Sequence, residues 1–153
     1  MNLGLLATFA GSLALALGCA TAPVPEPAAG AATDSTLELH LRFAGWQQER
    51  GRLVVAIYAD AASFEGSGPP HRAFRREVEG PTAEWSVELP PGAYGIKVYL
   101  DVDRDDELDR GAFGIPSEPY GFSNDARGSF GPPSWSAARF DLTGDATMAL
   151  ELR

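Results

Sequence analysis

Alternation of apolar and polar residues predicts a series of short β-strands along most of the chain. The segment Thr36–Phe43 alternates most regularly, with leucine or phenylalanine at every second position, which is typical of a strand with one buried face. The segment Arg52–Ala59 is apolar at nearly every position, which predicts a central strand covered on both faces. The same criteria predict five further strands, over residues 73–79, 82–89, 94–101, 138–142 and 147–152.

These strands predict one all-β domain over residues 36–153, a seven-stranded antiparallel β-sandwich of transthyretin-like or immunoglobulin-like type. All 12 prolines fall outside the predicted strands, as expected because proline cannot donate a hydrogen bond to a sheet. Asp60–Phe64 is predicted as a single helical turn. The last two strands are expected to form a closing hairpin around Thr143-Gly144-Asp145, whose residues favour a turn.

The start of the chain has a different pattern. Residues 1–18 carry no charged side chain and are mostly Leu, Ala and Gly, which is typical of a signal peptide. They lead into the string LALGC, residues 15–19, which resembles the lipobox of bacterial lipoproteins. That resemblance implies cleavage before Cys19 and a lipid anchor on this cysteine, and Ala20 after it implies the outer membrane of a Gram-negative cell. The alternative is ordinary cleavage after Ala22, which would give a secreted or periplasmic protein.

A Pro- and Ala-rich stretch separates this leader from the domain. Pro23, Pro25 and Pro27 interrupt residues 20–35, which show no apolar periodicity, so they are predicted to form a tether. The sequence therefore divides into a signal peptide (1–18), a lipidated cysteine with a tether (19–35) and the β-sandwich domain (36–153).

Charge and cysteine content limit the classes of partner. The formal net charge is −9, which argues against nucleic acid, because phosphate binding needs clustered Lys and Arg. The single cysteine excludes an internal disulfide and a cysteine-based zinc site. The negative charge is concentrated in residues 101–110, which hold six acidic and two arginine side chains.

The spacing of these acids resembles a calcium-binding loop with carboxylates at positions 1, 3, 5 and 9. Two positions depart from that pattern, because Asp106 replaces the glycine of position 6 and Ala112 replaces the glutamate of position 12. A weak calcium site and a solvated acidic loop both remain open, and Glu118 is a more distant ligand candidate. The predicted calcium ligands are Asp101, Asp103, Asp105, Glu107 and Asp109.

A loop rich in glycine and aromatic residues follows the acidic segment. It is either a contact surface for a glycan or a peptide, or a loop folded back over the core, the interpretation that we favour. No nucleophile, metalloprotease or phosphate-binding motif is present, so we predict no enzymatic activity; a hydrolase using paired carboxylates is the third alternative. The candidate contact residues are Phe113, Tyr120, Phe122 and Trp135.

Three strings in this order resemble the bacterial secreted domain-of-unknown-function family 2141. They are VVAIYADAASF, LPPGAYGIKVYLDVDRDDELD and FGIPSEPYGFSNDARGSFGPPSW, and the resemblance spans residues 37–152. It implies an all-β secreted domain without an established activity, so it assigns no catalytic residue.

Overall fold

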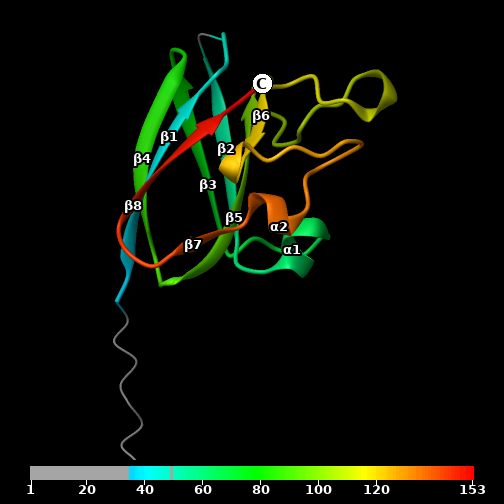
Figure 1. The fold of residues 1–153 in the computed structure, drawn as a ribbon. Helices are drawn as coiled ribbons and strands as arrows, with labels where there is room; N and C mark the ends of the chain where they lie inside the picture. Colours follow the sequence, from blue (N-terminus) through cyan, green and yellow to red (C-terminus); the bar gives the residue numbers. More distant parts are fainter. Residues whose placement is uncertain (1–34, 49) are drawn as a thin grey trace, which may run out of the picture. The chain divides into compact units, whose positions relative to one another are not determined.

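The computed structural model describes residues 35–48 and 50–153, so the predicted signal peptide, Cys19 and nearly all of the tether lie outside the described residues. The described part forms two β-sheets packed face to face, with short helices beside the larger sheet (Figure 1). The prediction of an all-β domain is confirmed.

The smaller sheet has the strand order β4-β1-β8, and the larger has the order β3-β2-β5-β6, with β7 also paired to β5. All pairs are antiparallel except β1 and β8, which are parallel. The described part has one strand more than the seven predicted, because the three-residue β6 lies in a segment that was predicted as loop. The strands are β1 (Leu37–Ala44), β2 (Arg50–Tyr58), β3 (Arg72–Glu79), β4 (Thr82–Leu89), β5 (Gly92–Asp101), β6 (Tyr120–Phe122), β7 (Phe140–Leu142) and β8 (Ala146–Glu151).

The helical elements are short. They are α1 (Ala61–Glu65), α2 (Trp135–Ala138) and the 3₁₀ turns η1 (Ala112–Gly114) and η2 (Ser123–Asp125). Helix α1 confirms the predicted turn, and it begins where the Asp60 side chain accepts a hydrogen bond of 2.8 Å from the Ser63 N–H, as a helix N-cap does. None of the helices in the described residues is long and apolar enough to cross a membrane.

The core lies between the sheets and is built from alternate residues of their strands. Leu39 and Leu41 of β1 are fully buried, and so are Leu53, Val55 and Ile57 of β2. Burying each side chain of this size stabilises the fold by about 1.5–3 kcal/mol. Strand β2 lies between β3 and β5, so the prediction of a central strand is confirmed.

Helices α1 and α2 cover part of the other face of the larger sheet, over β2 and β5. Phe64 of α1 is fully buried, and its ring packs edge-on against Tyr58 of β2 and Trp135 of α2, with centroids 5.5 and 5.6 Å away. The Lys97 ammonium lies 4.7 Å from the centroid of the Phe64 ring, and burial lowers the pKa of Lys97. This cover explains why β2 is apolar on both faces.

The predicted closing hairpin is wrong. Strand β7 joins the larger sheet and β8 the smaller, so the turn at residues 143–145 carries the chain from one sheet to the other. Leu142 and Leu150 are each 1% exposed and reach the core from opposite sheets. Strand β7 also begins at Phe140 rather than at Ala138, because residues 135–138 form α2. Alternation and turn residues predict the strands and the turn, but they do not determine which sheet each strand joins.

The residues that follow β8 close one side of the sandwich. The N–H of Tyr120 donates to the carbonyl of Arg153, and the N–H of Arg153 donates to the carbonyl of Tyr120, both at 3.0 Å. Gly121 lies at this contact, where an added Cβ would be 2.6 Å from the carbonyl oxygen of Glu151. Only glycine therefore lets β6 approach the end of β8 this closely.

We expect Gly121→Ala to lower the free energy of unfolding by about 1–3 kcal/mol, the usual cost of overpacking, because two backbones must separate. Gly144→Ala is the matched control, since an added Cβ there meets nothing within 4 Å. Urea denaturation of both variants checks the prediction. Equal stability of the two variants would show that the β6–β8 contact tolerates a side chain.

Candidate functional site

The acidic loop, residues 101–109, begins at the end of β5 and brings three predicted calcium ligands together. Asp101 is the last residue of β5 and is fully buried, whereas Asp103 and Asp105 are exposed. One carboxylate oxygen from each of the three lies within 4.8 Å of the others, and we call this group the carboxylate cluster. The predicted ligands Glu107 and Asp109 do not belong to it.

Hydrogen bonds bend the acidic loop around Asp101. Its Oδ1 accepts from the Arg104 N–H at 2.6 Å, and its Oδ2 accepts from the Asp106 N–H at 3.2 Å. Arg104 and Asp106 have φ values of 69° and 67°, in the left-handed region that Asp adopts more readily than most residues. Asp106 thus adopts the left-handed conformation at the position that the calcium-loop pattern gives to glycine.

Glu118, just before β6, holds the two ends of the acidic loop. Its side chain is buried, with the residue 6% exposed. Its Oε1 accepts from the Val102 N–H at 2.7 Å and its Oε2 from the Asp109 N–H at 3.1 Å. Both oxygens are engaged with the loop backbone, so Glu118 positions the loop, and it does not belong to the carboxylate cluster.

Arginines of β2 and β3 pair with part of the acidic loop. Arg52 Nη1 lies 3.1 Å from Asp106 Oδ1 and 3.9 Å from Asp101 Oδ2, and Arg75 Nε lies 3.0 Å from the same Asp106 oxygen. The Tyr99 hydroxyl donates to the Asp106 carbonyl at 2.8 Å. Burial, together with the nearby charge of Asp101, raises the pKa of Tyr99 to about 12, so this hydroxyl is a donor at neutral pH.

A second set of ion pairs centres on Glu77 of β3. Its carboxylate accepts from Arg52 Nε and from Arg104 Nη2, both at 3.0 Å. The hydrogen bond from Arg52, followed by that from Arg104, holds the pKa of Glu77 below its usual value. Within the described part of the chain, the arginines around the acidic loop pair with Glu77, Asp106 and Asp101, and not with Asp103 or Asp105.

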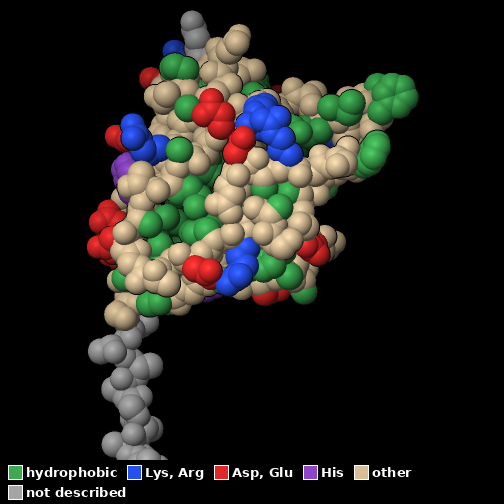
Figure 2. Space-filling model, in the orientation of Figure 1, with side chains coloured by type: hydrophobic (Ala, Val, Ile, Leu, Met, Phe, Trp, Pro, Cys, Tyr) green, Lys and Arg blue, Asp and Glu red, His purple; other side chains and the backbone are tan. Residues whose placement is uncertain are grey.

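An apolar groove lies at one end of the domain, between two loops with exposed aromatic side chains. Phe113 is 99% exposed and Phe130 is fully exposed, and Figure 2 shows hydrophobic side chains projecting from this end of the molecule. The cavity between the loops has a volume of about 680 Å³. We call it the aromatic groove, and it is lined from segments 108–116, 120–122 and 128–132.

Three of the four predicted contact residues line the aromatic groove, and the fourth packs against the domain. Phe113, Tyr120 and Phe122 line the aromatic groove, whereas Trp135 packs on Phe64 away from it. Phe130 lines the groove but was not among the predicted contacts. Glycines and prolines surround Phe130 in sequence, so no apolar pattern around it indicates that its ring is buried. Trp135, in contrast, forms α2 together with two alanines that follow it.

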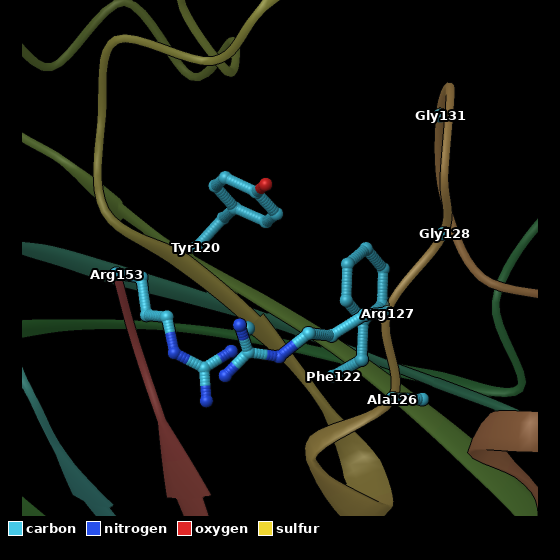
Figure 3. A pocket seen from close by; sticks show the side chains of 8 residues that line it. Tyr120, Phe122, Ala126, Arg127, Gly128, Gly131 and Arg153 are labelled. Carbon is cyan, nitrogen blue, oxygen red and sulfur yellow. The ribbon is translucent and has the colours of Figure 1, made fainter.

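A smaller cavity of about 230 Å³ adjoins the aromatic groove, and we call it the arginine cavity. The side chains of Arg127 and Arg153 extend toward each other in it, beside the rings of Tyr120 and Phe122 (Figure 3). Both guanidinium groups pair with Asp125, through Arg127 at 3.6 Å and through a direct hydrogen bond from Arg153. That hydrogen bond lowers the pKa of Asp125.

Sequence reasoning missed the arginine cavity because its charges come from distant segments. Asp125 and Arg127 lie in the segment predicted as a glycine- and aromatic-rich loop, and η2 within it contains a tight turn, with φ of 59° at Asn124 and 51° at Asp125. Arg153 lies 26 residues after Arg127 in the numbering, and only the pairing of its backbone with Tyr120 brings it into the cavity. No local spacing indicates this arrangement.

Carboxylate-dependent hydrolysis predicts a cleft with two facing carboxylates. The groove and the cavity just described are lined without aspartate or glutamate, and the carboxylate cluster lies on the acidic loop.

The lowered pKa of Glu77 predicts a dependence of stability on pH. A carboxylate whose pKa is lower in the folded protein stabilises it above the usual pKa, 4.5, and this contribution is lost as the pH falls through the folded value. We expect Glu77→Gln to be less stable than wild type at neutral pH and to lose less stability on acidification. Urea midpoints of wild type and Glu77→Gln, measured from neutral pH down through the pKa of Glu77, check this prediction. The control is Glu88→Gln, at an exposed site on β4. Identical dependence of stability on pH in wild type and Glu77→Gln would contradict the prediction.

One family model matches the chain, over residues 41–149. This span includes the acidic loop and the aromatic groove, and it lacks Arg153 of the arginine cavity. No curated protein and no solved structure matches. Because the model covers well over half of the 153 residues, the chain belongs to the family described as "Uncharacterized protein conserved in bacteria (DUF2141)".

Proposed function

We propose that this protein is a non-catalytic, lipid-anchored domain of the bacterial cell envelope, whose acidic loop binds calcium weakly. The observation that carries the calcium proposal is the carboxylate cluster, with oxygens of Asp101, Asp103 and Asp105 within 4.8 Å of one another. Three carboxylates at this separation repel each other unless a cation or protons intervene. A divalent cation between them removes that repulsion.

The chemistry of the donors favours calcium over softer metals. Calcium takes six to eight oxygen ligands in flexible geometry, and the cluster offers only carboxylate oxygens. Asp103 and Asp105 each use Oδ1 to accept a loop N–H, at 3.3 and 2.8 Å, which restricts the orientation of both side chains. Because water must complete the ligand set, we expect a dissociation constant of ~10⁻⁴–10⁻³ M, as in extracellular modules.

The role of the ion is structural. The acidic loop continues into residues 108–116, which form one wall of the aromatic groove. An ion that fixes residues 101–105 reduces the freedom of the segment that follows. Calcium thereby orders the groove without taking part in any reaction.

We expect ~10 mM calcium to raise the midpoint of thermal unfolding by several degrees, because a ligand at ten times a millimolar dissociation constant stabilises by about 1.4 kcal/mol. Asp103→Asn should abolish this rise. Glu107→Gln is the matched control, because it removes the same charge from the same loop outside the carboxylate cluster, and it should keep the rise.

Magnesium and a chelator complete this experiment. Magnesium demands octahedral geometry and should stabilise less. A midpoint that calcium does not change, or changes equally in Asp103→Asn, would leave the acidic loop as a solvated charged surface.

The anchor is proposed from the sequence alone. The string that ends in Cys19 resembles a lipobox, and Ala20 directs the protein to the outer membrane under the sorting that this resemblance implies. A Pro-rich tether then lets the domain stand several nanometres from the lipid, at ~3 Å per residue.

In a Gram-negative host, we expect the wild-type chain to incorporate a fatty-acid label and to fractionate with the outer membrane. Cys19→Ser should remove both properties. Mass spectrometry of the mature N-terminus decides between the two cleavage sites, since a chain that begins after Ala22 without lipid would overturn the anchor.

A further inference from the structure

The arginine cavity concentrates positive charge on a strongly acidic chain. Two guanidinium groups, from Arg127 and Arg153, share the single carboxylate of Asp125, which leaves one positive charge. Each guanidinium has five N–H donors in a planar fork, and each pairs with Asp125 through its Nη2. The remaining donors provide positive hydrogen-bonding capacity beside a cavity of about 230 Å³.

The carboxylate between the arginines is held by the fold. Ser123, which begins η2, is fully buried; its Oγ accepts from the Ile96 N–H at 2.9 Å and donates to the Ala138 carbonyl at 2.6 Å. Asn124 donates to the Arg139 carbonyl at 2.8 Å. These bonds fix the backbone of η2 to β5 and α2, so the position of Asp125 is set before any ligand arrives.

The walls of the cavity suit a ring with an apolar face. Tyr120 and Phe122 project from β6 with ring centroids 5.9 Å apart and nearly perpendicular, at 77°, and Figure 3 shows both rings beside the two arginines. Gly128 and Gly131 form the opposite wall, where a Cβ on Gly128 would lie 2.0 Å from the carbonyl oxygen of Gly131. This wall therefore presents backbone to a ligand.

We propose that the arginine cavity binds the carboxylate of an acidic sugar, with the sugar ring against Tyr120 and Phe122. Paired arginine forks match a planar carboxylate in charge and geometry, and aromatic rings pack well against the apolar face of a ring. Four of the lining residues, Tyr120, Phe122, Gly128 and Gly131, also line the aromatic groove. An oligosaccharide held at its carboxylate in the arginine cavity can therefore continue along the groove toward Phe113.

The structure favours a sugar over an extended peptide. Peptides commonly bind by adding a strand to a free sheet edge. The edge of β6 is already in use at Tyr120, whose N–H and carbonyl both bond to Arg153. This edge is therefore closed at Tyr120 to an added peptide strand.

This inference goes beyond the calcium and anchor proposals and does not depend on either. The glycan-binding alternative suggested by the glycine- and aromatic-rich loop thereby becomes specific for an acidic sugar, because Arg127 and Arg153 supply positive charge. Binding measured with excess chelator separates its outcome from that of the calcium proposal.

The test is a titration of the full chain, purified in detergent with excess chelator, with tetragalacturonate as the acidic probe. Its fully methyl-esterified form is the matched neutral probe, and inorganic phosphate is the probe for a general anion site. We expect the acid to bind at least about tenfold more tightly than the ester or phosphate, because charge-assisted hydrogen bonds form only with the carboxylate of the sugar. Equal binding of acid and ester, equal binding of phosphate, or no binding of the acid overturns the proposal.

Variants assign the binding to the cavity. Arg127→Gln and Arg153→Gln should each weaken binding about tenfold, whereas Arg139→Gln should not change it, because Arg139 pairs with Asp141 at 2.6 Å and does not line the cavity. Asp125→Asn removes the competing carboxylate and should tighten binding roughly two- to fivefold. Because misfolding cannot increase affinity, this variant tests the proposal even where an arginine variant is unstable. Unchanged or weaker binding by folded Asp125→Asn contradicts the proposal.

Discussion

The arginine cavity, and the aromatic groove beside it, depend on how the last strand connects the two sheets. Strand β8 runs parallel to β1 in the smaller sheet, with Leu39 opposite Ala146. Just beyond it, the backbone of Arg153 bonds to Tyr120 of β6, which belongs to the larger sheet. These bonds hold the segment after β5 against the domain. They place Arg153 beside Tyr120, which lines both the arginine cavity and the aromatic groove.

The sequence predicts those parts of this fold that depend on local pattern. Alternating leucines identified β1, apolar residues on both faces identified β2 as central, and the turn predicted at Asp60–Phe64 corresponds to the short helix α1. The pairing of β8 with β1 was not predictable, because hydrophobic alternation shows that Leu150 is buried and not which sheet buries it. The three-residue β6 was missed since its only regular feature is Gly121 between two aromatic residues, which reads equally well as loop.

The candidate site shows the same division between local and long-range information. The carboxylate cluster follows from a spacing of two residues along one loop, so the sequence placed Asp101, Asp103 and Asp105 correctly as neighbours in space. Glu107 and Asp109 continue the spacing but lie beyond the turn at Asp106, where the left-handed backbone changes the direction of the chain. The buried clamp of Glu118 and the convergence of Arg127 with Arg153 depend on tertiary contacts that no local spacing specifies.

The parallel pairing of β1 and β8 also has a consequence for folding. The side chain of Asp145 accepts a hydrogen bond from the Glu38 N–H across 107 residues of sequence, so the smaller sheet cannot be completed until nearly the whole domain is available. Contacts of such high sequence separation fold slowly, because the entropy of closing the loop is lost before the contacts form. A chain of this topology stays incompletely folded while its last strand is still being made. Under the export that we propose from the leader sequence, this delay keeps the chain unfolded for its passage through the membrane.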